Sequence, residues 1–446
     1  MVRGRKIGLP LATLLVASNM VGGIYLLPAT LAPFGSITVL GWLLAIAGAL
    51  VVARVLGRLG QHAALPGGVM AYAGRALGPF MGFQATAIYW MSCWIGNIAL
   101  AVVAVGYLGS FVPALAAPAH VAAAAIGVLA LMTLVNLLSP RFICQLESAA
   151  LLAGMVPIVV VLVGGWWHFH PGVFAASWNP SGLPAWRDLP PSLVLMFWAF
   201  LGLESASIGT AFVENPERNV GRATTYGVLL GAAIFMASCA LIMGQIPASE
   251  LARSTAPFAD AVRLIFGRAA GALVAAAALA KSIGSLGAWI LLTTETGQAG
   301  AERGQFLALF APRSRSQVPW VNLGLVFGIT TAGVWLSTSA TLGEQFGKII
   351  SVSTILTLLL YIYGCLSVWR YAELAPETFQ RERGWAMAGL LICLAVIVTS
   401  GTEMLAWAMA VVLLTLPLYP FCSGRMQARE AEADPGRKGA WDEQTQ

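Results

Sequence analysis

Two ionisable residues lie inside long apolar stretches of this sequence. Glu204 is part of the run FWAFLGLESASIG, and Lys281 precedes Trp289 by eight residues in another apolar run. A charge held at membrane depth is costly, so such residues are functional candidates by default. Glu204 is a candidate for proton sensing, with a static hydrogen-bond anchor as the alternative. Lys281 must extend to a membrane surface, pair with a partner or lose its proton.

Residues that commonly bind metals or perform covalent chemistry form no recognised arrangement. His168 and His170 make an HxH pair in the stretch WWHFHP, but no third ligand is near in sequence, so a solvated loop is the better interpretation. The six cysteines occur without CxxC spacing, which argues against a disulfide framework or a metal centre. The sequence contains no Walker motif, nucleophile elbow or HExxH motif. We therefore expect no enzyme activity, no cofactor and no bound metal.

Two apolar segments contain residues that an uninterrupted membrane helix would avoid. The string SNMVGGIYLLP places Gly22 and Gly23 near Asn19 at mid-membrane depth, where glycine weakens a helix and leaves backbone groups uncovered. The segment 197–209 similarly places a glycine and two serines beside Glu204. Paired breaks of this kind are typical of secondary transporters, whose half-helix ends attract a carboxylate and an ammonium. Close helix packing at small residues is the alternative interpretation of the glycine pair.

The composition requires a membrane around these segments. Of the 446 residues, 58% are hydrophobic and only 10% are charged, and the mean hydropathy is +0.80, a balance that is untypical of soluble domains. The roughly ten-residue alternating strands of a membrane barrel are not seen. Cutting the apolar runs at turn residues and charges predicts an all-α polytopic membrane protein with twelve transmembrane helices. The expected spans are 7–33, 37–58, 79–112, 119–138, 147–166, 190–212, 223–246, 269–297, 318–337, 346–370, 384–399 and 403–422.

Basic residues outside these spans are strongly biased to one side, which the positive-inside rule identifies as the cytoplasm. The net charge of +6 therefore reflects loop orientation rather than nucleic-acid binding, and both termini are expected in the cytoplasm. The tail 423–446 is charged and poor in apolar residues, so we expect a disordered cytoplasmic extension. We expect a multi-pass protein of a bacterial inner membrane. The cations that fall on the opposite side are Arg187, Arg253, Arg263, Arg268 and Lys348.

Several strings between about residue 7 and about residue 420 carry a family resemblance: LLPATLA, PGGVMAYAGRALGPFMGFQ, YWMSCWIGNIAL, FWAFLGLESAS with VENPERNV, and GSLGAWILL. They resemble the amino acid/polyamine/organocation superfamily, and within it the basic amino acid/polyamine antiporters, in particular those that exchange arginine for agmatine. The resemblance implies a leucine-transporter-type fold, a five-plus-five inverted repeat with discontinuous helices 1 and 6. The implied divisions are a cytoplasmic N-terminus at 1–6, repeats at 7–170 and 187–372, and trailing helices at 384–422 that often support a homodimer.

The resemblance also implies where a substrate would bind. Backbone groups around the first break would hold the α-carboxylate and α-ammonium, with carbonyls near the second break assisting. Trp289 would stack on a guanidinium as a cation–π partner, and Trp198 would form a second aromatic wall, although a membrane tryptophan is often an interface anchor. The residues implicated in this way are Asn19, Met20, Val21, Gly22, Gly23, Ile24, Trp198, Leu201 and Trp289.

Five further polar side chains resemble substrate contacts or gating residues of the family. Asn97 could accept hydrogen bonds from a guanidinium, or it could form an interhelical hydrogen bond instead. Ser92 and Ser351 could add hydroxyl contacts to the side-chain end of the substrate. Tyr89 and Tyr361 resemble gating or proton-sensing aromatics, although either could simply fill space.

Two features depart from the antiporter pattern. The first-helix motif lacks a serine between Gly22 and Gly23 that would bind the substrate carboxylate, which leaves the affinity and register of that end open. Lys281 stands where a small or neutral residue is expected. Sodium-coupled relatives of the same fold hold a cation between helices 1 and 8, so Lys281 would replace sodium with a tethered, titratable charge. The Glu204 position is linked in the family to pH response and to holding the broken helix.

The residues and the resemblance together predict a secondary active transporter. We expect exchange of a cationic amino acid, arginine, for its decarboxylated amine, agmatine, by alternating access. A proton-coupled, sodium-independent permease for another cationic or neutral amino acid is the first alternative, and an amino-acid sensor without transport is the second. The expected partners are small amino acids and amines, the lipid bilayer and a second copy of the chain, with no nucleic acid.

Overall fold

Helices account for most of the chain. The computed structural model describes residues 7–62, 67–116, 118–203, 213–306, 308–310 and 320–422, and outside its helices and turns this part contains one isolated bridge, between Ile7 and Val213. The helices are α1 (Leu9–Val21), α2 (Leu27–Leu31), α3 (Thr38–His62), α4 (Val69–Leu77), α5 (Pro79–Gly109), α6 (Pro118–Leu138), α7 (Pro140–Gly164), α8 (Pro171–Ala176), α9 (Ala185–Trp198), α11 (Pro216–Met243), α12 (Ala248–Leu251), α13 (Pro257–Glu302), α14 (Trp320–Leu336), α15 (Leu342–Leu374), α16 (Pro376–Phe379), α17 (Arg383–Thr399) and α18 (Thr402–Thr415).

Helix length and apolar composition identify the membrane spans. In the part of the chain that the structure describes, 9 helical stretches are long and apolar enough to cross a bilayer, namely those built on α3, α5, α6, α7, α11, α13, α15, α17 and α18. The shorter helices α1 with α2, α9 and α14 occupy the other three predicted positions. Many leucines on the outer faces are exposed in the isolated chain, as expected where side chains contact lipid. The prediction of an all-α polytopic membrane protein is confirmed.

Several helices begin earlier than the hydropathy pattern predicts, and α13 and α7 show the reason. α13 starts at Pro257, but Gly267 interrupts its helical conformation with φ +84°, which glycine adopts without steric cost. The part of α13 after this kink therefore begins next to the predicted start at 269. α7 starts at Pro140 instead of 147, where the Ser139 side chain accepts a hydrogen bond from the Phe142 amide. Both added turns carry charged residues, so a criterion based on apolar runs excludes them although proline and a cap favour helix initiation.

Helix 1 is interrupted where the sequence predicts a break, and α9 ends where the second break is predicted. α1 ends at Val21, and the chain passes through Gly22 and Gly23 before a 3-10 turn begins at Ile24. α9 ends at Trp198 and leads into turns that include Gly202 at φ +102°. Residues 204–212, which include the rest of the predicted sixth span, lie outside the described residues.

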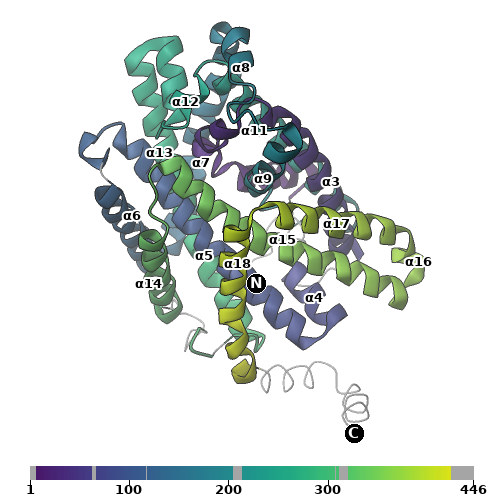
Figure 1. Cartoon of the computed structure of the whole chain (residues 1–446). Coiled ribbons are helices and arrows are strands. Elements are labelled where there is room, and N and C mark those ends of the chain that lie inside the picture. The colour runs from purple at the N-terminus through teal and green to yellow at the C-terminus, as the bar shows by residue number, and fades with distance from the viewer. Residues whose placement is uncertain are drawn as a thin grey trace.

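The helices pack in two sets that draw equally on both halves of the chain. α1, α3, α9 and α11 form one set, and α5, α6, α13 and α14 form the other; α7 packs on α13, and α15 packs on α5. Each set therefore contains two helices from the first half of the chain and two from the second half. The five-plus-five repeat remains a prediction. Figure 1 shows α8 and α12 at one end of the molecule and α4 at the other.

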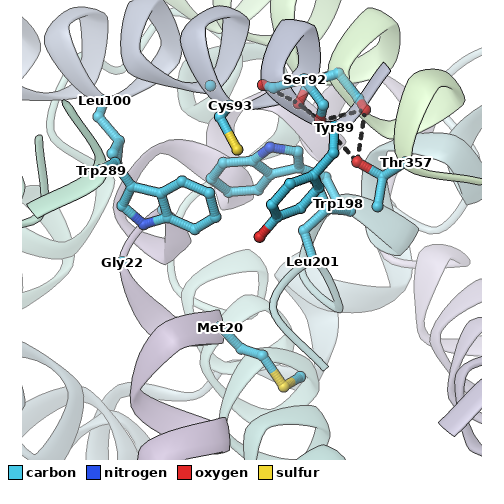
Figure 2. Close-up of a pocket in the computed structure, with 13 residues that line it drawn as sticks. Met20, Gly22, Tyr89, Ser92, Cys93, Leu100, Trp198, Leu201, Trp289 and Thr357 are labelled. Carbon is cyan, nitrogen blue, oxygen red and sulfur yellow. Dashed lines mark hydrogen bonds between the residues drawn. The ribbon is translucent and has the colours of Figure 1, made fainter. Parts of the chain in front are cut away.

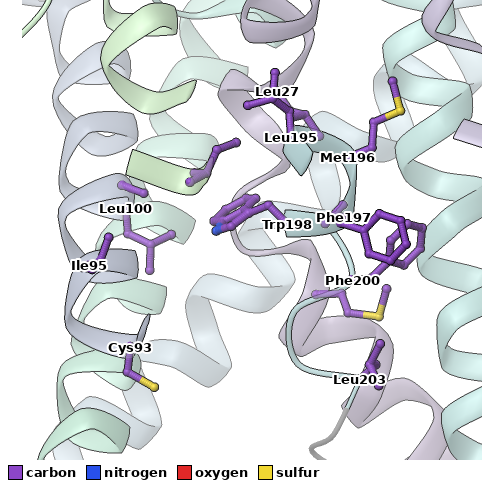
Figure 3. Packing of buried hydrophobic residues seen from close by; sticks show 14 of the residues in the cluster. Leu27, Cys93, Ile95, Leu100, Leu195, Met196, Phe197, Trp198, Phe200 and Leu203 are labelled. Atoms are coloured by element: carbon purple, nitrogen blue, oxygen red, sulfur yellow. The ribbon is translucent and has the colours of Figure 1, made fainter. Parts of the chain in front are cut away.

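Aromatic packing fixes the end of α9 between the two sets. Phe197 and Phe200 point away from α5, and Phe200 contacts Trp42 of α3 with ring centroids 6.2 Å apart. Trp198 points the opposite way, toward Cys93 and Leu100 of α5 (Figure 3). Phe197 and Phe200 pack on one side of this helix end and Trp198 packs on the other, so the packing of the two phenylalanines fixes the position of Trp198.

Candidate functional site

A cavity lies where the two helix breaks meet α5, α13 and α15. It has about 510 Å³ of space between atoms, counting its open side. The first break, the end of helix α9 and the faces of three continuous helices each contribute to its wall. The residues that line it are Met20, Gly22, Gly23, Tyr89, Ser92, Cys93, Gly96, Leu100, Trp198, Leu201, Trp289, Ser353 and Thr357.

Trp198 closes one side of this cavity by packing on the backbone of the first break. A Cβ atom at Gly23 would lie only 1.5 Å from the Trp198 ring, so the indole occupies the space that any side chain at position 23 would need. On its other side the indole meets Phe346 of α15 edge-on, with centroids 5.3 Å apart. Trp198 is therefore held between helix 1 and α15, and only 9% of it is exposed.

Three aromatic side chains surround the same space. Figure 2 shows Trp289, Trp198 and Tyr89 with their rings around the cavity, and Met20 beyond them on the side of α1. Trp289 is partly buried, whereas Tyr89 is almost completely buried. Aromatic faces attract cations, and the attraction grows when water is excluded. The arrangement suits a small molecule that carries a positive charge.

Hydroxyl groups form the wall between α5 and α15. The Ser92 oxygen lies 3.0 Å from the Ser353 hydroxyl and 2.7 Å from the Thr357 hydroxyl. Ser92 and Ser353 also bond each other's backbone carbonyls, so the two helices are joined at this point. Hydroxyl oxygens retain acceptor capacity beyond these bonds, which suits an ammonium or guanidinium donor.

The ends of broken helices supply the electrostatic field of the site. Among the described lining residues there is no ionisable carboxylate and no basic side chain. The 3-10 turn begins immediately after Gly23 and is followed by α2 from Leu27, and amides at a helix start favour an anion. α9 ends at Trp198, where helix carbonyls favour a cation. An amino acid's carboxylate and α-ammonium match these two helix ends.

Eight of the residues predicted from sequence come together in the lining of the cavity. Their role as substrate contacts remains a prediction, but their convergence from four regions of the chain is a structural finding. They are Met20, Gly22, Gly23, Tyr89, Ser92, Trp198, Leu201 and Trp289.

Four other predicted residues are described but do not line the cavity. Asn97 is fully buried, and its amide donates to the Thr293 hydroxyl at 3.3 Å, which is the interhelical bond considered as its alternative role. The Ser351 hydroxyl bonds the Gly347 carbonyl of its own helix. Ile24 and Tyr361 are buried elsewhere in the core.

Of the two ionisable candidates, the structure describes Lys281 but not Glu204. Lys281 is 1% exposed and donates to a carboxylate oxygen of Glu147, so its ammonium does not extend to a membrane surface. Glu204 lies outside the described residues. The backbone of Asn19 and Val21 belongs to α1, but their side chains also lie outside the described part.

Sequence reasoning missed five lining residues. Three of them follow Tyr89 at helical spacing, so the periodicity of α5 could have identified them. The hydroxyls of α15 were expected two residues too early, and two residues correspond to more than half a helical turn. The missed residues are Cys93, Gly96, Leu100, Ser353 and Thr357.

The fold and the cavity define a polytopic membrane permease with a central site at paired helix breaks. Residues 7–417 match the family described as amino acid permease. The chain belongs to this family, which lies within the amino acid/polyamine/organocation superfamily. It is accordingly a permease for amino acids or polyamines and not an enzyme.

Curated relatives match over almost their whole length. The cadaverine/lysine antiporter of Escherichia coli (strain K12) is 33% identical over 425 residues, covering 94% of this chain and 95% of that protein. The putrescine transporter PotE of the same strain is 30% identical over 431 residues, covering 96% of this chain and 98% of that protein. PotE of Haemophilus influenzae is 29% identical over 432 residues, covering 96% of this chain and 99% of that protein. These relatives carry lysine, cadaverine and putrescine in their names rather than arginine or agmatine.

Proposed function

We propose that this protein exchanges a cationic amino acid for its decarboxylated amine by alternating access. The cavity at the two breaks supports this proposal because different parts of its wall suit the α-carbon end and the distal cation of the substrate. Helix ends at Gly23 and Trp198 suit the α-carbon groups, whereas Trp289 and the hydroxyl wall suit the distal cation. Decarboxylation removes only the carboxylate and leaves the distal cation unchanged, so one cavity can hold both members of the pair.

We propose lysine and cadaverine as the first pair to test. A relative that shares one third of its residues with this chain is a cadaverine/lysine antiporter. Arginine and agmatine form the second pair, favoured by the Trp289 indole in the lining, because a planar guanidinium stacks well on an aromatic face. Putrescine is a third exchange partner, as PotE is named for its transport.

Counterflow in proteoliposomes tests the exchange directly. Vesicles containing the purified protein are loaded with lysine, cadaverine, arginine, agmatine, putrescine or nothing, and uptake of labelled lysine and arginine is measured. Exchange predicts uptake only into loaded vesicles, and the loading that gives the fastest uptake identifies the pair. Uptake into empty vesicles driven by a proton gradient would instead establish a proton-coupled permease. Binding without flux under any loading would establish a sensor.

The hydroxyl wall provides a variant that tests the location of the site. Ser353→Ala should weaken binding of the cationic substrate about tenfold, because one charge-assisted hydrogen bond contributes about 1.5 kcal/mol. Ser367→Ala is the matched control, since Ser367 lies on the same helix and bonds the Tyr363 carbonyl of its own helix. Equal affinities for the two variants would place the substrate elsewhere.

A further inference from the structure

The most unusual contact outside the cavity is a buried ion pair between two membrane helices. Lys281 of α13 is 1% exposed, and its ammonium donates to one carboxylate oxygen of Glu147 of α7. The Glu147 side chain is 28% exposed, so only one member of the pair is in contact with the surroundings. A buried ammonium is tolerated at such depth only when it is paired.

The pair is also close to the first helix break. A Cβ atom at Gly154 of α7 would lie 2.5 Å from Lys281 Cγ and 2.7 Å from the Tyr25 hydroxyl oxygen. Tyr25, which immediately follows the break, donates to the Gly154 carbonyl at 2.7 Å. The Tyr107 hydroxyl of α5 in turn donates to the Tyr25 carbonyl at 2.9 Å. The lysine, the carboxylate and the broken helix therefore meet at one junction.

Glu147 retains a polar atom without a partner. Its second oxygen, Oε2, is buried and has no hydrogen-bond partner among the described residues. A carboxylate that ligates an ammonium through one oxygen has the second free to take a proton. The titratable groups near the pair are the Tyr25 phenol, which lies at Gly154 beside the aliphatic part of Lys281, and the Tyr107 phenol of α5, which bonds the Tyr25 carbonyl. The Glu147 carboxylate from α7 bonds the Lys281 ammonium directly.

We infer that Glu147 and Lys281 are positioning residues for transport. Their ion pair links the contact between α7 and α13 to the first helix break, and it makes the transport rate depend on pH. Protonation of Glu147 would leave the Lys281 ammonium uncompensated among apolar helices. Such protonation would destabilise the arrangement in which α7, α13 and the break are joined. The pair lies outside the cavity lining, so it acts on the transition between states rather than on substrate contact. The inference rests on the exchange proposed above.

Three variants distinguish the effect of an unpaired charge from the effect of changed side-chain packing. Glu147→Gln leaves a buried ammonium without a counter-ion, so the maximal exchange rate should fall at least tenfold while substrate affinity changes less than twofold. Lys281→Met should also lower the rate, because it leaves the Glu147 carboxylate without its counter-ion. The double variant Lys281→Met/Glu147→Gln should recover much of the lost rate and show a flatter pH profile than the wild-type protein. Lys348→Met and Glu344→Gln are matched controls from an exposed lysine–glutamate pair and should leave the rate and the pH profile unchanged.

A second readout does not depend on the substrate assignment. In a Cys144→Ser background, labelling of cavity residue Cys93 by a small thiol reagent reports opening of the cavity, with Cys93→Ala as the blank. Its rate should change with pH in the wild-type protein and lose that dependence in the double variant. If exchange fails for every substrate but this difference persists, the exchange proposal falls and the coupling pair stands. Glu147→Gln with a wild-type rate and an unchanged labelling profile would overturn the inference.

Discussion

Gly23 is held as glycine by an aromatic ring, not by a backbone angle. Its φ of −111° is accessible to other residues, but the Trp198 indole occupies the position of a Cβ atom at 1.5 Å. The close approach joins the two broken helices across the chain. The absence of a side chain at this residue is therefore a requirement of the site.

Gly23→Ala should destabilise the protein by about 3 kcal/mol, at the upper end of overpacking penalties, because both the helix break and the indole are constrained. Thermal unfolding of the detergent-solubilised protein measures the effect. Gly127→Ala on α6 is the control, since a Cβ there meets nothing within 4 Å, and it should leave stability unchanged or slightly raised. A stable, active Gly23→Ala protein would show that Trp198 moves freely.

Trp289 supplies the aromatic face that the proposed substrates require. Trp289→Ala should weaken binding of the cationic substrate by about 1–2 kcal/mol, or roughly 5–30-fold in Kd, and Trp289→Phe should retain part of that energy. Equilibrium binding in detergent measures the difference. Trp335→Ala, which removes an exposed tryptophan of α14, should have no effect on Kd. Equal loss in both alanine variants would indicate a general packing defect.

At the scale of elements, an ionic cluster joins α3 to the turn before α17. Glu382 has a side chain that is 4% exposed, and it accepts hydrogen bonds from Arg54 and Arg58. The Arg54 guanidinium also lies 4.7 Å above the Trp385 ring. The cluster connects a helix of the first half to the helices that follow the second half.

Glu382→Gln should lower the free energy of unfolding by about 1.5 kcal/mol, because two half-exposed arginines lose charge-assisted hydrogen bonds to a buried carboxylate. The control is Glu373→Gln, which breaks the exposed ion pair with Arg370 and should cost less than about 1 kcal/mol. Thermal unfolding at low and high salt separates the two. A similar small effect for both variants would show that the cluster is solvated.

At the scale of the whole molecule, charge distribution predicts orientation. With both termini in the cytoplasm of a bacterial cell, a fluorescent protein fused to the C-terminus should fluoresce and a periplasm-dependent alkaline phosphatase fused there should be inactive. The same pair of reporters inserted after Gly182, between α8 and α9, should give the opposite result. The homodimer and the repeat boundaries also concern the whole molecule, and both remain predictions.

The sequence by itself determined the membrane class, the approximate positions of the nine long spans in the described part of the chain, the position of the first break and the place where α9 ends. These features depend on local composition: apolar run length sets the spans, and glycine next to polar residues at membrane depth marks a break. The residues around Gly22, Trp198 and Trp289 could be identified because the breaks and the family strings are contiguous in sequence.

Only the tertiary structure decided which side chains meet. Ser353, not Ser351, lines the cavity because helical phase and the approach of α5 select one face of α15. Lys281 pairs with Glu147, 134 residues away in sequence, because α7 and α13 pack along each other. Local sequence patterns do not show which side chains contact each other, because a contact between distant segments depends on how whole helices pack. Hydropathy indicates only whether each segment is stable in lipid.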